Sequence, residues 1–134
     1  MTCECTVNAA PGAVFAAWTE RFDSWFAQPG TLAMVPEPGR PYFFYNRDEW
    51  GRHPHYGRFL DVVQDELIEM TWITGNGDAV GTEGAETVLR IELAAKAGAT
   101  EIRLTHSGFA SEESCKGHRD NWPLALETLG EALS

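Results

Sequence analysis

The sequence THSGF at residues 105–109 decides the fold, because it closes a strand and leads into a long helix. The residues around its start alternate in polarity, so that Ile102, Leu104 and His106 share one face of a half-buried strand. Ser111 then offers a helix N-cap, and the two glutamates after it occupy the first turn, where the helix dipole favours negative charge. A strand, a glycine corner and an amphipathic helix together predict a helix that folds back over a sheet.

The helix expected after this corner carries one apolar stripe. Its members recur at mostly three- and four-residue steps, the period of one helix face; they are Cys115, His118, Trp122, Leu126, Leu129 and Leu133. Pro123 lies within this helix. Because proline removes a backbone hydrogen bond, we expect a kink or a restart near Asn121.

Upstream, alternating polarity and turn residues predict two short helices between a first strand and a meander. Residues 2–8 alternate as a strand, Pro11 begins a helix, and a second short helix ends before Pro29. Further strands are expected at residues 32–35, 41–46, 56–63, 67–73, 87–93 and 100–106. This order predicts an α+β fold in which a curved antiparallel sheet wraps around the C-terminal helix and the two short helices close one end.

Length and composition indicate one domain without nucleic-acid or membrane partners. The 134 residues suit a single domain, and 43% of them are hydrophobic, enough for a substantial core. The net charge of -10 supplies no basic surface for a phosphate backbone. We find no signal peptide and no apolar run long enough to cross a bilayer. With 3 cysteines and no CxxC pair, we expect a cytoplasmic protein, and we expect no cofactor.

Short phrases spread along the chain occur in an order typical of one family. They are Val14-Phe15 with Trp18, Pro38-Gly39, Gly57-Arg58-Phe59 with Val62-Val63, Met70-Thr71-Trp72, and Leu104 to Phe109 followed by Trp122, Leu126 and Leu129. Together they resemble the START-like SRPBCC superfamily, and more narrowly the family related to the activator of the heat-shock protein 90 ATPase. The resemblance covers nearly the whole chain and implies one START-like SRPBCC domain over residues 1–134. Two departures, Arg40 and Asn121 where the family often has glycine, concern local turn and helix packing rather than the fold.

The resemblance implies a helix-grip fold, the architecture of START domains and the birch pollen allergen, with a cavity that holds an apolar ligand in many relatives. It implies no single activity, since relatives include ligand carriers, cyclase-like enzymes and chaperone cofactors. Our leading hypothesis is a non-catalytic or unassigned protein that binds an apolar or aromatic small molecule between the sheet and the last helix. One alternative is a chaperone-activator-like interaction domain, and another is a cyclase- or hydrolase-like enzyme that uses His106.

The inner faces of the expected elements project mostly aromatic side chains toward such a cavity. They are Trp18, Trp25, Tyr42, Phe44, Phe59, Met70, Trp72, Leu89, His106 and Trp122. As a group they have the composition of a small-molecule site, which is a largely apolar surface with a few polar groups. The alternative is that each of them only fills the core, where large aromatic side chains are common.

His106 is the most informative polar member of this set and the one catalytic candidate. An inward imidazole could orient a ligand or act as an acid or base near neutral pH. The alternative, which we favour, is a structural histidine bonded to Ser107, Trp122 or the backbone, because a buried polar group needs a partner. His118, in the helix expected after this strand, is a candidate neighbour of His106.

The sequence HPH at residues 53–55, beside Trp50 and Tyr56, could chelate zinc only if a third ligand arrived. None is evident, so we expect no metal site. Because proline is found at sheet edges and in loops, we expect a hairpin loop that is exposed or lies at the cavity mouth.

Residues 75–86 contain four glycines and loosely resemble a phosphate loop. No helix or lysine follows them, and two nearby acidic side chains would repel phosphate. These residues therefore indicate a flexible hairpin loop that could act as a lid.

Phe43 and Tyr45 would project from the outer face of the sheet if Tyr42 and Phe44 point inward. Two outward aromatic side chains on one strand suggest a homodimer patch. Scattered surface aromatics are an equally good explanation at this point.

Overall fold

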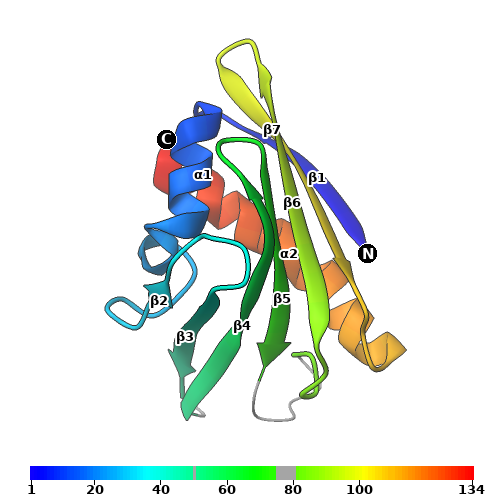
Figure 1. Cartoon of the computed structure of the whole chain (residues 1–134). Coiled ribbons are helices and arrows are strands. Elements are labelled where there is room, and N and C mark those ends of the chain that lie inside the picture. The colour runs from blue at the N-terminus through cyan, green and yellow to red at the C-terminus, as the bar shows by residue number, and fades with distance from the viewer. Residues whose placement is uncertain (50, 75–80) are drawn as a thin grey trace.

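The C-terminal helix lies across the inner face of a curved antiparallel sheet, with the two short helices at one end (Figure 1). The computed structural model describes residues 1–49, 51–74 and 81–134. The strands are β1 (Thr2–Val7), β2 (Ala33–Met34), β3 (Pro41–Asp48), β4 (Gly51–Val63), β5 (Leu67–Thr74), β6 (Thr87–Lys96) and β7 (Ala99–Ser107); the helices are α1 (Pro11–Thr19), the 3-10 helix η1 (Phe22–Ser24) and α2 (Glu112–Leu133). The α+β helix-grip fold expected from the sequence is confirmed.

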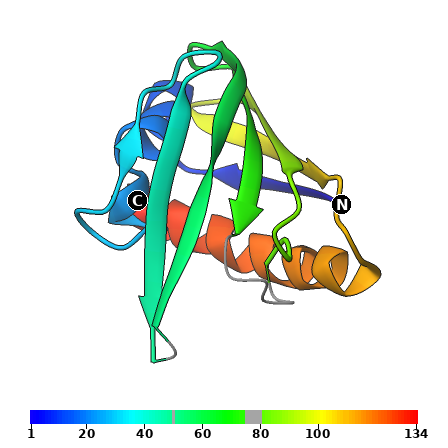
Figure 2. The ribbon, with the colours of Figure 1, turned by 60° about the horizontal axis from the view of Figure 1, so that its bottom comes forward.

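The 7-stranded sheet has the order β1-β7-β6-β5-β4-β3-β2, and the register is antiparallel throughout. The first strand pairs with the last, which places Cys5 opposite Ile102 at one edge. The short strand β2 forms the other edge, so the described sheet stays open. It curves over α2, which lies lengthwise beneath the strands in Figure 2.

Helix α2 begins at a serine N-cap and continues past the proline in its interior. The Ser111 hydroxyl oxygen accepts a hydrogen bond from the Ser114 N–H at 3.0 Å, which confirms the predicted N-cap. The helix runs unbroken from Glu112 to Leu133, so the restart predicted near Asn121 is wrong. Pro123 removes one backbone hydrogen bond, but the buried side chains of Trp122 and Leu126 on either side hold the helix against the sheet.

Strand β4 is longer than the sequence predicts. It starts at Gly51, so residues 53–55 lie in a strand, and the hairpin loop expected there is wrong. Pro54 pairs with Tyr45 of β3, beyond the point where His55 faces Thr74 at the end of β5. Proline is tolerated here because β4 has no described neighbour on its second side at this level. The glycine-rich loop and lid expected from residue 75 begin in residues 75–80, outside the described residues.

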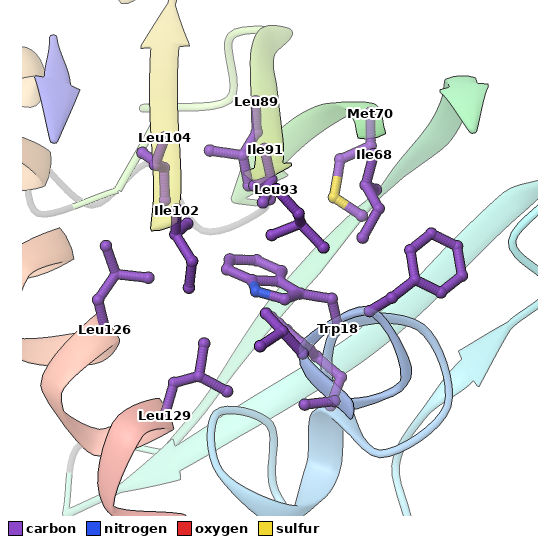
Figure 3. Packing of buried hydrophobic residues seen from close by; sticks show 14 of the residues in the cluster. Trp18, Ile68, Met70, Leu89, Ile91, Leu93, Ile102, Leu104, Leu126 and Leu129 are labelled. Atoms are coloured by element: carbon purple, nitrogen blue, oxygen red, sulfur yellow. The ribbon is translucent and has the colours of Figure 1, made fainter. Parts of the chain in front are cut away.

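The core gathers around Trp18, whose side chain is fully buried (Figure 3). Leu126 and Leu129 of α2 approach it from one side, and side chains of the inner sheet face, including Ile91, approach from the other. The indole N–H of Trp18 has no hydrogen-bond partner among the described residues, so this side chain contributes through apolar packing. We call Trp18, Ile91, Ile102, Leu126 and Leu129 the packed end of the sheet–helix interface.

Candidate functional site

A cavity of about 200 Å³ lies between the sheet and the first half of α2. Its lining residues come from the segment after η1, from β4 and β5, and from α2: Phe26, His55, Trp72, His118, Asn121, Trp122 and Ala125. We call this set the cavity end of the interface. Asn121 is exposed, so it marks the rim where the cavity meets solvent.

Three aromatic rings form the apolar wall of the cavity. The ring centroids of Phe26, Trp72 and Trp122 lie between 5.5 and 5.7 Å from one another. Phe26 and Trp122 are stacked, and each meets Trp72 at a steeper angle. A flat apolar molecule would therefore find ring faces and edges that are already held in place.

His55 reaches this wall from β4, where the alternation of the strand turns its side chain inward. Its ring stacks on Phe44 at a centroid distance of 4.8 Å. Its Nδ1 donates a hydrogen bond to the His53 carbonyl oxygen at 3.0 Å, which leaves Nε2 as the nitrogen with a lone pair. Burial lowers the pKa of His55 to about 4, so the ring is neutral at pH 7.

His118 faces the cavity from α2. Its Nδ1 donates to the carbonyl oxygen of Ser114, one helical turn earlier, at 2.8 Å. Burial also lowers the pKa of His118 below its ordinary value. Two neutral imidazoles, one from the sheet and one from the helix, thus line the same cavity and each keeps an unprotonated Nε2.

His106 lies behind Trp122 and uses both of its ring nitrogens within the protein. The indole N–H of Trp122 donates to His106 Nδ1 at 3.0 Å. His106 Nε2 must then carry the proton, and it donates to the Thr87 hydroxyl oxygen at 2.7 Å. The Thr87 hydroxyl donates in turn to the Trp72 carbonyl oxygen. Burial lowers the pKa of His106 to about 2, in accord with a neutral ring that holds Trp122 in position.

The fold agrees with a family assignment that covers nearly the whole chain. Residues 8–134 match the model of the family described as activator of Hsp90 ATPase homolog 1-like protein. The chain belongs to this family. The resemblance stated from the sequence phrases is therefore confirmed.

Solved structures similar to this AHSA1-like chain share its fold along the full length. A crystal structure of a Mesorhizobium loti protein is 19% identical with a TM-score of 0.78, covering 99% of this chain and 96% of that one. An AHSA1 protein from Silicibacter pomeroyi is 22% identical, with a TM-score of 0.78 and the same coverage of 99% and 96%. The Aha1 dimer of Colwellia psychrerythraea, solved in solution, is 18% identical, with a TM-score of 0.70 and coverage of 99% and 94%. Similarity at this level of identity shows the fold alone, and no curated protein matches the chain significantly.

The structure places the predicted cavity residues of this AHSA1-like chain in two groups. Trp72 and Trp122 line the cavity. Most of the others are buried core side chains that do not line it, namely Trp18, Tyr42, Phe44, Phe59, Met70, Leu89 and His106. Trp25 is half-buried and donates its indole N–H to the Ala17 carbonyl oxygen at 2.8 Å.

Five lining residues were absent from the predicted set: Phe26, His55, His118, Asn121 and Ala125. Two of them left a signal in the sequence. His118 belongs to the apolar stripe of α2, where a polar side chain is unusual, and His55 is part of the motif expected at a loop or cavity mouth. Phe26 belongs to the aromatic spacing of the short helices, but its place in the lining depends on how the segment after η1 folds back over Phe44, which local spacing does not determine.

Other chemistry-bearing residues of the AHSA1-like chain stay dispersed. Cys3, Cys5 and Cys115 are free thiols. Among the residues that the structure describes, no three histidine, cysteine or acidic side chains come together as a metal-binding group. No helix within the described ranges combines the length and the hydropathy needed to span a membrane.

Proposed function

We propose that this protein binds a small apolar or aromatic molecule in the cavity between the sheet and α2. The observation that carries the proposal is a cavity of about 200 Å³ walled by Phe26, Trp72 and Trp122, next to a core of buried apolar side chains. Small-molecule sites are concave and mostly apolar with a few polar groups, which is the composition of this lining. An apolar cavity of about 150 Å³ is large enough to bind benzene. The occupant proposed here is therefore a molecule of one or two rings.

Native mass spectrometry of the freshly purified protein, followed by calorimetry with neutral aromatic compounds, tests this proposal. Ala125→Leu extends a side chain into the cavity and should abolish binding. Leu124→Ala, a change at the neighbouring side chain that is 60% exposed, should leave binding unchanged. The proposal fails if no molecule co-purifies and no compound binds, or if Ala125→Leu binds as well as the unaltered protein.

A chaperone-activator-like role is the second candidate, and the family match over residues 8–134 favours it. Such a role would use the outer surface rather than the cavity. Stimulation of the ATPase of an Hsp90-type chaperone, together with its capture by this protein, would support it. Absence of both effects would exclude it.

A homodimer formed through the outer face of β3 and β4 is also proposed. Phe43 and Tyr56 face each other across the two strands, and 43% and 40% of their surfaces are exposed. Tyr45, expected in the same patch, is half-buried, and the guanidinium carbon of Arg52 lies over its ring at 5.2 Å from the ring centroid. The Colwellia relative is described as a dimer. Sedimentation should give a dimer that Phe43→Ser dissociates; a monomer at high concentration would contradict the proposal.

Catalysis by a cyclase- or hydrolase-like enzyme would use His106, whose two ring nitrogens are both bonded inside the protein; this supports a positioning role for His106 instead. We also propose a cytoplasmic location. The three free thiols support it, since a reducing compartment keeps cysteines in that state.

A further inference from the structure

The two histidines of the cavity lining present hydrogen-bond acceptors and no ring N–H donors to the cavity. His55 and His118 each give their Nδ1 proton to a backbone carbonyl, of His53 and of Ser114. A neutral imidazole has one N–H, so each ring then offers only an acceptor at Nε2. The choice of tautomer is set by the backbone of this chain and not by an incoming ligand.

Both acceptors are held in fixed orientations. The His55 ring stacks on Phe44 with an interplanar angle of 7°. The His118 ring lies edge-on to His106 at 4.6 Å and 4.9 Å from the ring of Phe109. A half-turn of either ring would keep these ring contacts but would break its Nδ1 hydrogen bond to the backbone carbonyl oxygen, so the two hydrogen bonds hold the orientation.

The charge of the cavity lining also favours a neutral ligand that donates a hydrogen bond. The described residues that line it include no aspartate, glutamate, lysine or arginine. A carboxylate would meet two acceptor nitrogens and no cation, and a hydrocarbon would leave both acceptors without the water that had bonded them. A molecule with its own N–H or O–H donor satisfies an acceptor and the aromatic wall at once.

We infer that the cavity selects a neutral aromatic molecule of one or two rings that carries an N–H or O–H group, which donates to Nε2 of His55 or His118. This inference rests on the proposed function, because it names the ligand class of the same cavity. It adds a prediction that does not follow from the proposal that the cavity binds apolar molecules. Between two ligands of equal size and apolar area, the one that can donate a hydrogen bond binds more tightly.

The isomers 3-methylindole and 1-methylindole provide this comparison, because they have the same atoms and ring system but only the first keeps an N–H. Calorimetry on the unaltered protein should show 3-methylindole binding about fivefold to tenfold more tightly, the usual net effect of one hydrogen bond. The double variant His55→Phe/His118→Phe keeps two rings in place and should bind both isomers equally. Leu124→Ala, on the exposed side of α2, should keep the preference.

The possible results separate the two proposals. Equal binding of the isomers by the unaltered protein overturns the inference and leaves the cavity as a binder of apolar molecules. A preference that survives in the double variant also overturns it, because the donor then bonds elsewhere. If neither isomer nor any other neutral aromatic compound binds, the proposed function itself fails. The isomer comparison needs no substitution, so it holds even if the double variant does not fold.

Discussion

The two halves of α2 meet the same sheet in different ways. At the packed end, Leu126 and Leu129 are at most 2% exposed and pack against Trp18 and the sheet. At the cavity end, one residue earlier on the same helix, Ala125 borders open space. One helix thus fills the core with its large apolar side chains at one end and leaves open space at the other, where a small residue lies in the same lining as two histidines and three aromatic rings.

The polar groups of the two ends differ as well. The packed end consists of apolar side chains and one indole N–H without a described partner. The cavity end contains His55 and His118, with His106 directly behind it, and burial keeps all three neutral. We therefore expect apolar volume to govern stability at the packed end, and protonation to act mainly at the cavity end.

The largest effect is expected from Trp18→Ala at the packed end. Trp18 is fully buried, and its loss should lower the free energy of unfolding by about 4 kcal/mol, within the range for a buried tryptophan. Phe26→Ala at the cavity end should cost less, because Phe26 is half-buried and already borders a void. Urea unfolding at pH 7.5 measures both; equal losses would contradict the division into two ends.

Acid is expected to destabilise the protein through the cavity end. A histidine with a folded pKa below the ordinary 6.5 binds its proton more readily in the unfolded chain, so stability is complete above pH 6.5 and falls as the pH decreases. The fall continues to about pH 4 for His55 and to about pH 2 for His106. At pH 5, proton binding to the unfolded chain at each of these two histidines should lower the free energy of unfolding by about 2 kcal/mol, since one pKa unit corresponds to about 1.4 kcal/mol.

Unfolding by urea at pH 7.5 and at pH 5 measures this loss. His55→Phe has no proton to bind at this position, so the loss between the two pH values should shrink by about 2 kcal/mol. A variant with the same pH dependence as the unaltered protein would show that His55 is not held neutral by burial.

The smallest effect is expected from the substitution of alanine by leucine, whose change in the free energy of unfolding can be compared between the two ends. Ala17 precedes Trp18 of the packed end in α1 and is 2% exposed, so Ala17→Leu should lower the free energy of unfolding by about 2 kcal/mol through overpacking. Ala125→Leu extends into existing space and should cost less than about 1 kcal/mol. Thermal unfolding of both variants checks the difference. The reverse order would mean that the cavity is not open to a side chain.

The packed end could be predicted from the sequence more fully than the cavity end. Period-two alternation in β7 and spacings of three and four residues in α2 place Ile102, Leu104, Leu126 and Leu129 inward, because these patterns depend only on local geometry. The N-cap at Ser111 is equally local. For this reason the fold class and most core residues follow from the chain alone.

The cavity end depends on contacts between distant segments. Pro54 suggested a loop, yet pairing with β3 extends β4 through it and turns His55 inward. Phe26 reaches Trp122 only because the segment after η1 folds back toward α2. Nine of the ten residues projected toward a cavity are buried and Trp25 is half-buried, but whether inward side chains leave space is decided by packing in three dimensions.

The indole N–H signals of the tryptophans in a ¹H–¹⁵N correlation spectrum test the central claim most directly. Each signal is assigned by its loss in a single Trp→Phe variant, and 3-methylindole is then titrated into the unaltered protein. Our account predicts that the signals of Trp72 and Trp122 shift and saturate together, while the signal of Trp18 stays in place. A titration that moves Trp18 as much as Trp72 and Trp122, or that moves none of the three, would contradict a binding cavity at this end of the interface.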